Sequence, residues 1–277
     1  MKEVPMRLNK FVAHNSTYSR READETIRLG FVKVNGAVEK DPAVDVNDED
    51  EVRLKGKLIE SNSLLTVLVY NKKKGELVTK KDPKGRKTIY DSLPFKHRHL
   101  MPVGRLDFAS EGLLLLTDNS EVATLLMTSE IPRLYKIKIQ GKITPAMQTA
   151  MKEGLHAEDA TKGGHELSKI RSMTFAPFAG YEIIKNQDSF SILKVSITEG
   201  QNRELRRFFG YFDCEVVDLK RISFGAISLD ALPDGKSRYL SRKEYTDLKE
   251  FIKELKKEAK NPKKKKSEPQ EENREND

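Results

Sequence analysis

Apolar residues near the start of the chain recur first at helical spacing. Three of them, at positions 8, 11 and 12, predict a short amphipathic helix. A second helix is expected to begin at Ser19, whose hydroxyl can cap it while Glu22 reaches back in a capping box, and to end at Gly30. Two consecutive helices are therefore expected to open the fold.

Strand patterns follow these helices. Residues 31–34 lead into Asn35-Gly36, a strong signal for a two-residue hairpin turn. Residues 50–54 supply a further strand, so residues 6–54 are expected to form one compact helix-helix-hairpin unit. Residues 55–63 are polar and contain Gly and Ser, which predicts a linker.

The longer part of the chain, residues 64–256, mixes strand and helix patterns. Apolar runs at 64–70, 135–139 and 192–197 predict strands, and a helical pattern at 145–151 lies between two of them. This order is typical of a mixed α+β domain.

The last helix is predicted from Ser241 to about Lys257. Its apolar positions form a stripe of five residues: Tyr245, Leu248, Phe251, Ile252 and Leu255. Residues 257–277 contain almost nothing apolar, which predicts a disordered tail whose run of four lysines is solvated.

The charge of the chain narrows the class of its partner. The formal net charge is +8, and residues 257–277 contribute only +1 because they hold seven basic and six acidic side chains. The rest therefore carries +7, which favours a polyanion such as nucleic acid over a membrane surface. No apolar run approaches the ~18 residues that a membrane span needs. A protein that is merely soluble and basic is the alternative.

The cysteine and histidine content argues against intrachain disulfides and against a metal site. Cys214 is the only cysteine, so no intrachain disulfide can form, and the first residues lack the apolar stretch of a secretory signal. Both observations indicate a cytoplasmic protein. The five histidines are scattered and are interpreted as structural or solvated, so no metal site is expected.

The stretch Gly104-Arg105-Leu106-Asp107 sets a carboxylate and a guanidinium on a tight turn. The apolar run of residues 112–117 follows and predicts a core strand that ends at the cap of a helix expected over 121–127. Asp107 would then lie in the loop at the entrance of that strand, where a reactive carboxylate can be held still. Taken alone, these four residues also fit a surface turn in which the Asp and the Arg form a salt bridge.

A second motif, residues 199–207, runs from an alternating strand into a helix whose expected N-cap is Asn202. Three arginines lie on its first turns: Arg203, Arg206 and Arg207. They pair either with Glu204 and solvent, or with a buried carboxylate and phosphates, which the planar guanidinium suits.

The segment from Ser19 to Ala23, continued by Val34-Asn35-Gly36, resembles the S4 RNA-binding domain over nearly its whole length. This resemblance implies binding of structured RNA through shape and phosphate contacts. Basic side chains away from the apolar positions would form the contact face: Arg7, Lys10, Arg20, Arg21, Arg28 and Lys33. The alternative is a charged face that is only solvated.

Residues from about 6 to 255 together resemble the pseudouridine synthases, and among them the bacterial ribosomal RsuA/RluB type. Four blocks carry the resemblance: the S4 segment, residues 70–88, residues 104–117 and residues 199–207. It implies an α+β protein in which a small N-terminal S4 (αL-like) domain, residues 6–54, precedes a larger domain with a mixed, mainly antiparallel sheet, residues 64–256.

Some positions depart from the family pattern. Lys73 stands where Pro is common, Ser110 where Thr is usual, and Asp118-Asn119-Ser120 where Asn-Asp-Gly is expected. None of them removes a group that the chemistry needs, and they bear on loop rigidity.

The resemblance implies that Asp107 is the catalytic aspartate. Pseudouridine formation breaks the N1–C1′ bond of a uridine, turns the base and rejoins it through C5, so the carboxylate acts either as a covalent nucleophile or as a base on the ribose. Arg206 matches the position of its charge partner, and Arg203 and Arg207 are expected to face phosphates.

Three further residues are expected to act on the target nucleotide, by contacting it or by replacing it in the RNA stack. Tyr135 is expected on a buried strand face with Ile137 and Ile139, and the family has an active-site tyrosine in this block, whose ring would stack on the uracil. Plain core packing is the alternative for this tyrosine. Ile197 is expected to form the opposite apolar wall, and Arg105 to enter the RNA stack when the target nucleotide leaves it.

The resulting hypothesis is an RNA pseudouridine synthase that needs no metal or cofactor. Its expected substrate is ribosomal RNA or a ribosomal assembly intermediate, with large-subunit (23S) RNA preferred over small-subunit and transfer RNA, and it is expected to work as a monomer. A non-catalytic S4-type ribosome assembly factor is the alternative from another class. A metal-dependent nuclease would need more acids or histidines near Asp107 than Glu111 and Asp118 supply.

Overall fold

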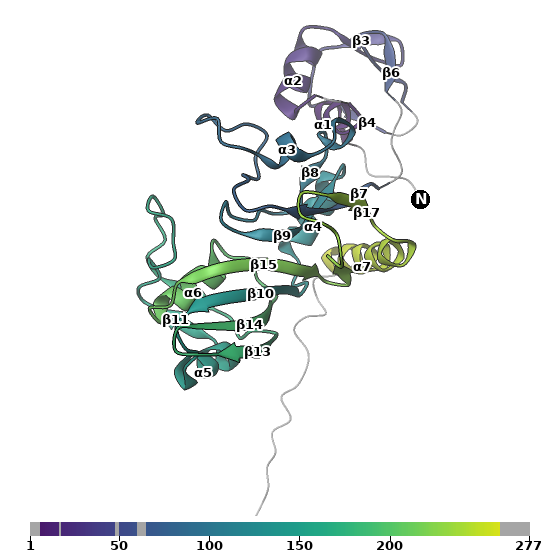
Figure 1. The fold of residues 1–277 in the computed structure, drawn as a ribbon. Coiled ribbons are helices and arrows are strands. Elements are labelled where there is room, and N and C mark those ends of the chain that lie inside the picture. Colours follow the sequence, from purple (N-terminus) through teal and green to yellow (C-terminus); the bar gives the residue numbers. More distant parts are fainter. Residues whose placement is uncertain (1–5, 17, 48–49, 60–64, 261–277) are drawn as a thin grey trace, which may run out of the picture.

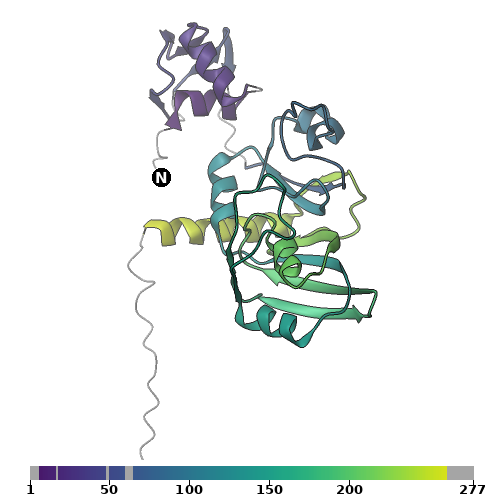
Figure 2. The ribbon, with the colours of Figure 1, turned by 90° about the vertical axis from the view of Figure 1, so that its left-hand side faces the viewer.

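The computed structural model describes residues 6–16, 18–47, 50–59 and 65–260. A small N-terminal unit lies at one end of the molecule, and a larger unit built on one long sheet forms the rest (Figures 1 and 2).

In the N-terminal unit, two short helices cover a small sheet. The helices α1 (Leu8–His14) and α2 (Arg20–Arg28) bury their apolar faces against a four-stranded sheet of order β3-β2-β5-β6. The strands are β2 (Val32–Val34), β3 (Ala37–Glu39), β5 (Val52–Leu54) and β6 (Lys57–Ile59), and a separate pair joins β1 (Met6–Arg7) to β4 (Asp45–Val46).

The local signals predicted for this unit are confirmed. Ser19 Oγ accepts a hydrogen bond from the Glu22 amide at 3.3 Å, and the Glu22 carboxylate accepts one from the Ser19 amide at 2.7 Å. Asn35 and Gly36 both have positive φ, 52° and 86°, as a two-residue hairpin turn of this type requires.

The predicted linker over residues 55–63 is wrong in its first part. Lys55 and Gly56 form a second tight turn with φ of 51° and 81°, and Lys57–Ile59 is the strand β6, paired with β5. Its last residue, Ile59, is buried in the core of the unit, and this burial draws the polar segment into the sheet. Residues 60–64 lie outside the described part.

The larger unit contains a nine-stranded sheet whose main path is β13-β14-β10-β15-β9-β7-β17, with β8 beside β9 and β16 beside β15. Every pairing is antiparallel except that of β9 with β15. The strands are β7 (Val67–Lys72), β8 (Met101–Pro102), β9 (Glu111–Thr117), β10 (Arg133–Gln140), β13 (Gly180–Asn186), β14 (Phe190–Ile197), β15 (Val216–Phe224), β16 (Ile227–Ser228) and β17 (Ser237–Tyr239). A mixed, mainly antiparallel α+β fold is therefore confirmed.

Helices and a small hairpin flank this sheet. They are α3 (Ile89–Ser92), the 3₁₀ turn η1 (Phe95–His97), α4 (Ser120–Thr128), α5 (Pro145–Glu153), α6 (Glu204–Tyr211) and α7 (Arg242–Lys260), with β11 (Leu155–Ala157) pairing with β12 (Met173–Phe175). The last helix runs beyond its predicted end at Lys257, because Lys, Glu and Ala at its end all favour helix. The predicted disordered tail therefore cannot begin at 257, and the rest of it lies outside the described residues.

Both faces of the sheet are covered, which explains the unbroken apolar run at 112–117. Leu114 and Leu116 of β9 join the core that contains α5 and α6. Leu113 and Leu115 join the opposite core, which contains α4 and α7. A strand buried on both faces has no polar side to alternate with.

Gly112 fixes the start of β9 against β15. Its φ is +101°, and a Cβ at this position would lie 2.2 Å from the carbonyl oxygen of Arg221. Only glycine allows the two strands to approach this closely, so the loop that precedes β9 has a fixed starting point.

Two absences hold for the described ranges. No helix within them is long and apolar enough to cross a membrane. No group of three or more His, Cys, Asp or Glu side chains within them is arranged to hold a metal ion.

Candidate active site

Asp107 lies on a tight turn at the entrance of β9, as the sequence predicts. The amide of Ser110 donates to the carbonyl oxygen of Asp107 at 3.0 Å and closes the turn. The Asp107 side chain is about one-third exposed, so its carboxylate can meet a bound molecule.

All four carbonyl oxygens of this catalytic turn, residues 107–110, accept hydrogen bonds from other parts of the fold. Lys72 Nζ donates to the carbonyls of Asp107 at 3.0 Å and of Ser110 at 2.7 Å. The Gly75 amide donates to Phe108 O at 2.8 Å, and Arg206 donates to Ala109 O at 3.2 Å. The backbone that carries Asp107 is therefore fixed from two sides.

Lys72 is a residue of this site that the sequence analysis missed. It ends β7, is fully buried, and donates to a third carbonyl, that of Lys73, at 2.9 Å. Burial lowers the pKa of the Lys72 ammonium to about 8. The sequence did contain a signal for this role, because a lysine ends an apolar strand. A buried ammonium there needs hydrogen-bond acceptors such as backbone carbonyls.

Arg206 comes from α6 and meets Asp107. Its Nε lies 3.7 Å from Asp107 Oδ2, while Nη1 donates to Val216 O at 2.8 Å and Nη2 to Ser110 Oγ at 3.2 Å. Burial, followed by the nearby charge of Arg203, lowers the pKa of this arginine. Nε is buried and has no hydrogen-bond partner within the described chain, so its N–H remains available to a carboxylate that moves closer.

Arg203 supplies the second cation at the same oxygen. Its Nη1 lies 3.7 Å from Asp107 Oδ2, and its Nε donates to Gly163 O at 2.7 Å. Arg203 is also the residue at the N-cap of α6, with a positive φ of 52°, so the predicted cap at Asn202 is wrong. The Asn202 side chain instead accepts a hydrogen bond from Arg207 at 3.3 Å.

Arg207 has a different role from the one expected. Its side chain is fully buried and donates to Ala160 O, to Ser168 Oγ at 2.8 Å and to Asn202 O at 3.0 Å. A guanidinium with these partners cannot face phosphates. It holds the loop of residues 160–168 against α6, because it donates to a carbonyl and to a hydroxyl of that loop, those of Ala160 and Ser168.

Tyr135 and Ile197 lie on neighbouring strands of one sheet face. In the register of β10 with β14, Tyr135 faces Val195 and Arg133 faces Ile197. Both Tyr135 and Ile197 are at least nine-tenths buried, in the core that contains α6. The predicted buried face is confirmed.

Arg105 is exposed two residues before Asp107. It makes no hydrogen bond or ion pair with any part of the chain that the structure describes. The side chain is therefore free to meet another molecule.

The six basic residues predicted on the S4 face are exposed or half-buried. On α2, Arg21 and Arg28 lie opposite the buried Ala23 and Ile27. None of the six forms an ion pair within the described residues, so their charged groups are not held by partners of this chain.

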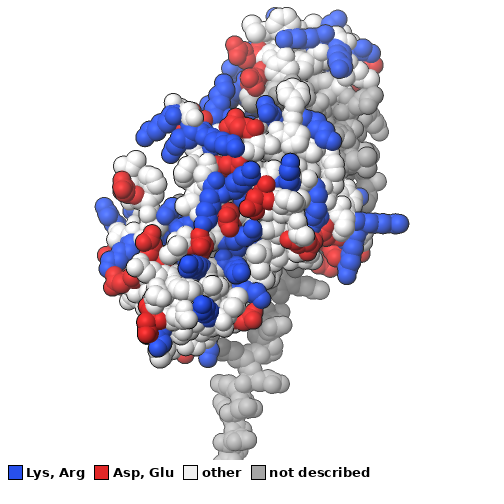
Figure 3. Space-filling view, viewed as in Figure 1, with Lys and Arg blue, Asp and Glu red and all other residues white. Residues whose placement is uncertain are grey.

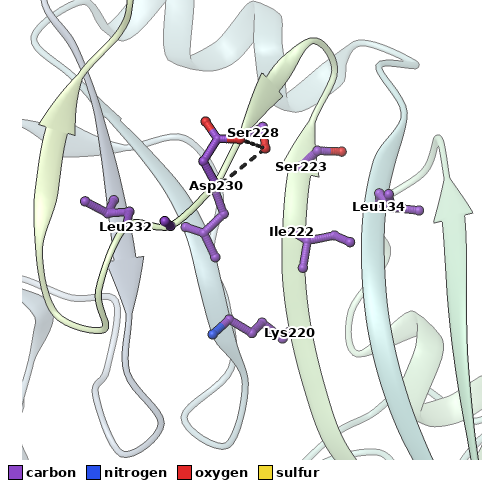
Figure 4. A pocket seen from close by; sticks show the side chains of 9 residues that line it. Leu134, Lys220, Ile222, Ser223, Ser228, Asp230 and Leu232 are labelled. Atoms are coloured by element: carbon purple, nitrogen blue, oxygen red, sulfur yellow. Dashed lines mark hydrogen bonds between the residues drawn. The ribbon is translucent and has the colours of Figure 1, made fainter.

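A shallow cavity of about 470 Å³ lies away from these residues (Figure 4). Leu134 and Ile222 are among its lining side chains, with Lys220 and Asp230 at its polar side. Leu134 precedes Tyr135 on β10, so the cavity opens on the opposite face of the sheet from Tyr135. It contributes nothing to the arrangement around Asp107.

Two family models match the chain. The model described as RNA pseudouridylate synthase matches residues 66–211, and the S4 domain model matches residues 6–52.

Similar proteins agree with both models. An "uncharacterized RNA pseudouridine synthase" of Helicobacter pylori is 50% identical over 254 residues, covering 91% of this chain and 97% of that protein. The "ribosomal large subunit pseudouridine synthase B" of Bacillus subtilis is 33% identical over 245 residues, covering 88% and 95%. A solved structure titled "Crystal structure of pseudouridylate synthase" superposes with a TM-score of 0.57 at 26% identity, covering 88% of this chain and 99% of that one.

Proposed function

Because the chain belongs to the RNA pseudouridine synthases and carries an S4 domain, we propose that it isomerises one uridine of ribosomal RNA, in the large subunit. The observation that carries this proposal is the Asp107 carboxylate, held on a fully bonded turn with Arg203 and Arg206 each 3.7 Å from one of its oxygens. Enzymes of this family are isomerases, so no atom is gained or lost by the RNA.

Asp107 acts on the ribose of the flipped uridine. The carboxylate either attacks C1′ as the N1–C1′ bond breaks, or removes a ribose proton to start the same cleavage, and the base then rejoins through C5. Both routes need an ionised carboxylate, and the Arg203 and Arg206 guanidinium groups each lie 3.7 Å from one of its oxygens. The proton lost from C5 and the proton gained at N1 balance, so the reaction consumes no other reactant.

The bonded turn supports this chemistry by preorganisation. Lys72 and Arg206 together hold three of the four carbonyl oxygens of the turn, so Asp107 does not need to reorganise when the nucleotide arrives. Tyr135 and Ile197 supply an aromatic and an aliphatic side chain on one sheet face, which suits a stacked uracil. Arg105, exposed and unpaired in the described chain, is the group that replaces the flipped base in the RNA stack.

We assign RNA docking to residues 6–54, with residues 64–256 as the catalytic domain. The exposed arginines of α2 have no internal partners, which suits contact with phosphates. The choice of large-subunit RNA is supported by the relative from Bacillus subtilis, which is named ribosomal large subunit pseudouridine synthase B. The proposed enzyme works as a monomer.

The test is pseudouridine mapping by chemical adduct and primer extension. Purified chain is incubated with large-subunit ribosomal RNA, small-subunit ribosomal RNA and bulk transfer RNA. One new site in the large-subunit RNA is expected. A site in another RNA would overturn the target but keep the reaction.

Asp107→Asn is the diagnostic variant, with Asp188→Asn as a matched control because that exposed carboxylate lies in the β13–β14 hairpin. Asp107→Asn should form no product while binding RNA within a few-fold of the parent chain. Turnover by that variant would remove Asp107 from the mechanism. Binding without product by the parent chain on every RNA would favour the non-catalytic assembly factor.

Arg20→Ala combined with Arg21→Ala tests the docking surface. The pair should weaken RNA binding and flatten its dependence on salt, because fewer counterions are released. Unchanged binding would mean that this basic face of the S4 domain is only solvated.

A further inference from the structure

A basic arm, residues 78–87, projects from the catalytic domain on the side nearest the S4 domain (Figures 1 and 2). Its base is closed by a hydrogen bond from the Leu77 amide to Lys87 O at 2.9 Å. Its tip is a turn in which the Gly85 amide donates to Asp82 O at 3.0 Å and the Arg86 guanidinium binds the Asp82 carboxylate at 2.8 Å. The arm is therefore a closed and ordered loop.

The segment that leads into the arm is bonded to the catalytic turn. Lys72 donates to the Asp107 carbonyl, and the Gly75 amide donates to the carbonyl of Phe108. The Phe108 ring lies against Gly75, since a Cβ at Gly75 would be 4.0 Å from Phe108 Cζ. That ring is 45% exposed although it directly follows Asp107.

The arm and the segment before it are strongly basic. Residues 73–87 hold seven basic and two acidic side chains, a net charge of +5. Figure 3 shows Lys and Arg side chains gathered over the arm, at the upper left of that view.

Some of these cations have internal partners. Lys74 pairs with Asp218, Arg86 with Asp82, and the Lys80 ammonium lies 3.9 Å from the centroid of the Tyr90 ring. The amines of Lys81 and Lys84 are exposed and form no hydrogen bond or ion pair within the described ranges.

The position of Lys81 links the arm to the RNA-docking domain. Hydrogen bonds from Ser19 lower the pKa of the Glu22 carboxyl, and the Lys81 charge adds to the same effect. Lys81 is therefore near the start of α2, the helix that carries Arg20 and Arg21.

We propose that the basic arm and Phe108 form a second RNA contact, separate from the S4 face and from the groups assigned to the target uridine. Lys81 and Lys84 neutralise backbone phosphates of the strand that enters the site, and the Phe108 ring stacks on the base next to the target. This inference rests on the proposed function. Two features support RNA as the molecule that binds here. Residues 73–87 carry a net charge of +5, and the exposed ring of Phe108 directly follows Asp107 in the chain.

The first experiment measures how RNA binding depends on salt. The variant combines Lys81→Gln with Lys84→Gln. The control combines Lys152→Gln with Lys253→Gln, two exposed lysines on α5 and α7 without ion pairs in the described chain. All proteins also carry Asp107→Asn, so the RNA, a large-subunit ribosomal RNA transcript, is not modified during titration.

The arm variant should reduce the slope of log K against log salt by about 1.4, the value for two phosphate contacts on a single strand. The control should leave the slope unchanged. Equal slopes in the two variants would overturn the arm contact and would mean that these lysines are solvated. Because no turnover is measured, this result does not depend on whether the chain forms pseudouridine.

The second experiment tests the stacking ring. Phe108→Ala should raise Kd about fivefold or more, whereas Phe108→Tyr should keep it within about twofold, because stacking of one base on an aromatic ring contributes ~1–3 kcal/mol. Thermal melts of both variants verify that the fold is retained. An alanine variant that is folded and binds like the parent chain would remove Phe108 from the contact. With Asp107 intact, failure of the proposed function would instead show as absence of product in every variant.

Discussion

Arg206 Nε lies 3.7 Å from Asp107 Oδ2, and the same guanidinium is fixed to the backbone at both of its other nitrogens. Its partners there are Val216 O on β15 and Ala109 O on the catalytic turn. One side chain thus joins α6, β15 and the turn that carries the carboxylate. The position of the cation is set by main-chain groups, and the carboxylate is carried by a turn that the same guanidinium holds.

Replacing Arg206 by Lys should therefore impair turnover although it keeps the charge. A lysine has one nitrogen and cannot reach Val216 O, Ala109 O and Asp107 together. We expect the single-turnover rate to fall about 100-fold or more, with RNA affinity within a few-fold. Rates at saturating RNA, measured beside binding titrations, separate the two effects. A Lys variant with the parent rate would show that the guanidinium geometry is unimportant.

The pH dependence of the turnover rate should reflect the protonation state of Lys72. Its pKa in the fold is about 8, so the ammonium loses a proton as the pH rises through that value. A neutral amine has two N–H donors and cannot serve the carbonyls of Lys73, Asp107 and Ser110 together. Single-turnover rates should fall above about pH 8 as the catalytic turn loosens.

Unfolding is not the expected cause of that loss. The unfolded chain keeps the Lys72 proton up to about pH 10.4, so between the two pKa values the unfolded state binds more protons. This group alone makes the fold more stable as the pH rises through that window. Urea titrations at each pH verify this, and Lys72→Met should show a low rate without the step near pH 8. A parent profile that stays flat to about pH 9 would contradict the role of Lys72.

Several parts of this structure follow from local sequence signals. The helix over 20–28, the hairpin at Asn35-Gly36 and the loop position of Asp107 depend on contacts within a few residues of each other. The alternation of apolar residues over 135–139 also predicted that Tyr135 lies on the buried face of its strand. Side chains alternate between the two faces of a strand whatever the strand packs against. These features need no knowledge of distant segments.

The remaining parts depend on contacts between distant segments. Arg206 and Arg207 are neighbours of the same type, and only the fold separates them. The loop of residues 160–168 folds back on α6 at Gly163, where a Cβ would lie 2.1 Å from Arg206 O, and this approach buries Arg207. Two of the three carbonyl partners of Lys72, those of Asp107 and Ser110, lie more than thirty positions away along the chain, beyond any local window of the sequence.

Arg203 and Arg207 should therefore respond in opposite ways to substitution. Arg207→Met removes a buried guanidinium and leaves the carbonyls of Ala160 and Asn202 without donors, so we expect a loss of about 3–5 kcal/mol in the free energy of unfolding. Arg203→Met should cost about 1 kcal/mol or less, because its guanidinium is partly exposed, but should slow turnover. Urea denaturation and single-turnover rates distinguish them. Similar stability losses in both would contradict the structural role of Arg207.

The last prediction concerns the stability of the fold near neutral pH. Glu204 opens α6 and is buried, with the Gln201 amide donating to its carboxylate at 2.9 Å. Burial raises the pKa of the Glu204 carboxyl to about 7. Between its unfolded value of about 4.3 and this value, the folded state keeps a proton that the unfolded state has lost. The contribution of Glu204 to stability is therefore complete below about pH 4 and is lost as the pH rises to about 7.

Glu204→Gln should remove this dependence. Glutamine keeps an oxygen that can accept from the Gln201 amide and has no charge to bury, so the variant should match the parent chain near pH 4 and exceed its free energy of unfolding by about 3 kcal/mol at pH 8. Urea denaturation across that range is the measurement, with Glu153→Gln as a control because that carboxylate is exposed at the end of α5, away from Glu204. A constant difference between Glu204→Gln and the parent at all pH values would mean that Glu204 keeps its charge in the fold. In that case the cation of Arg133, whose charge acts on this carboxyl, would be stronger than the burial that opposes it.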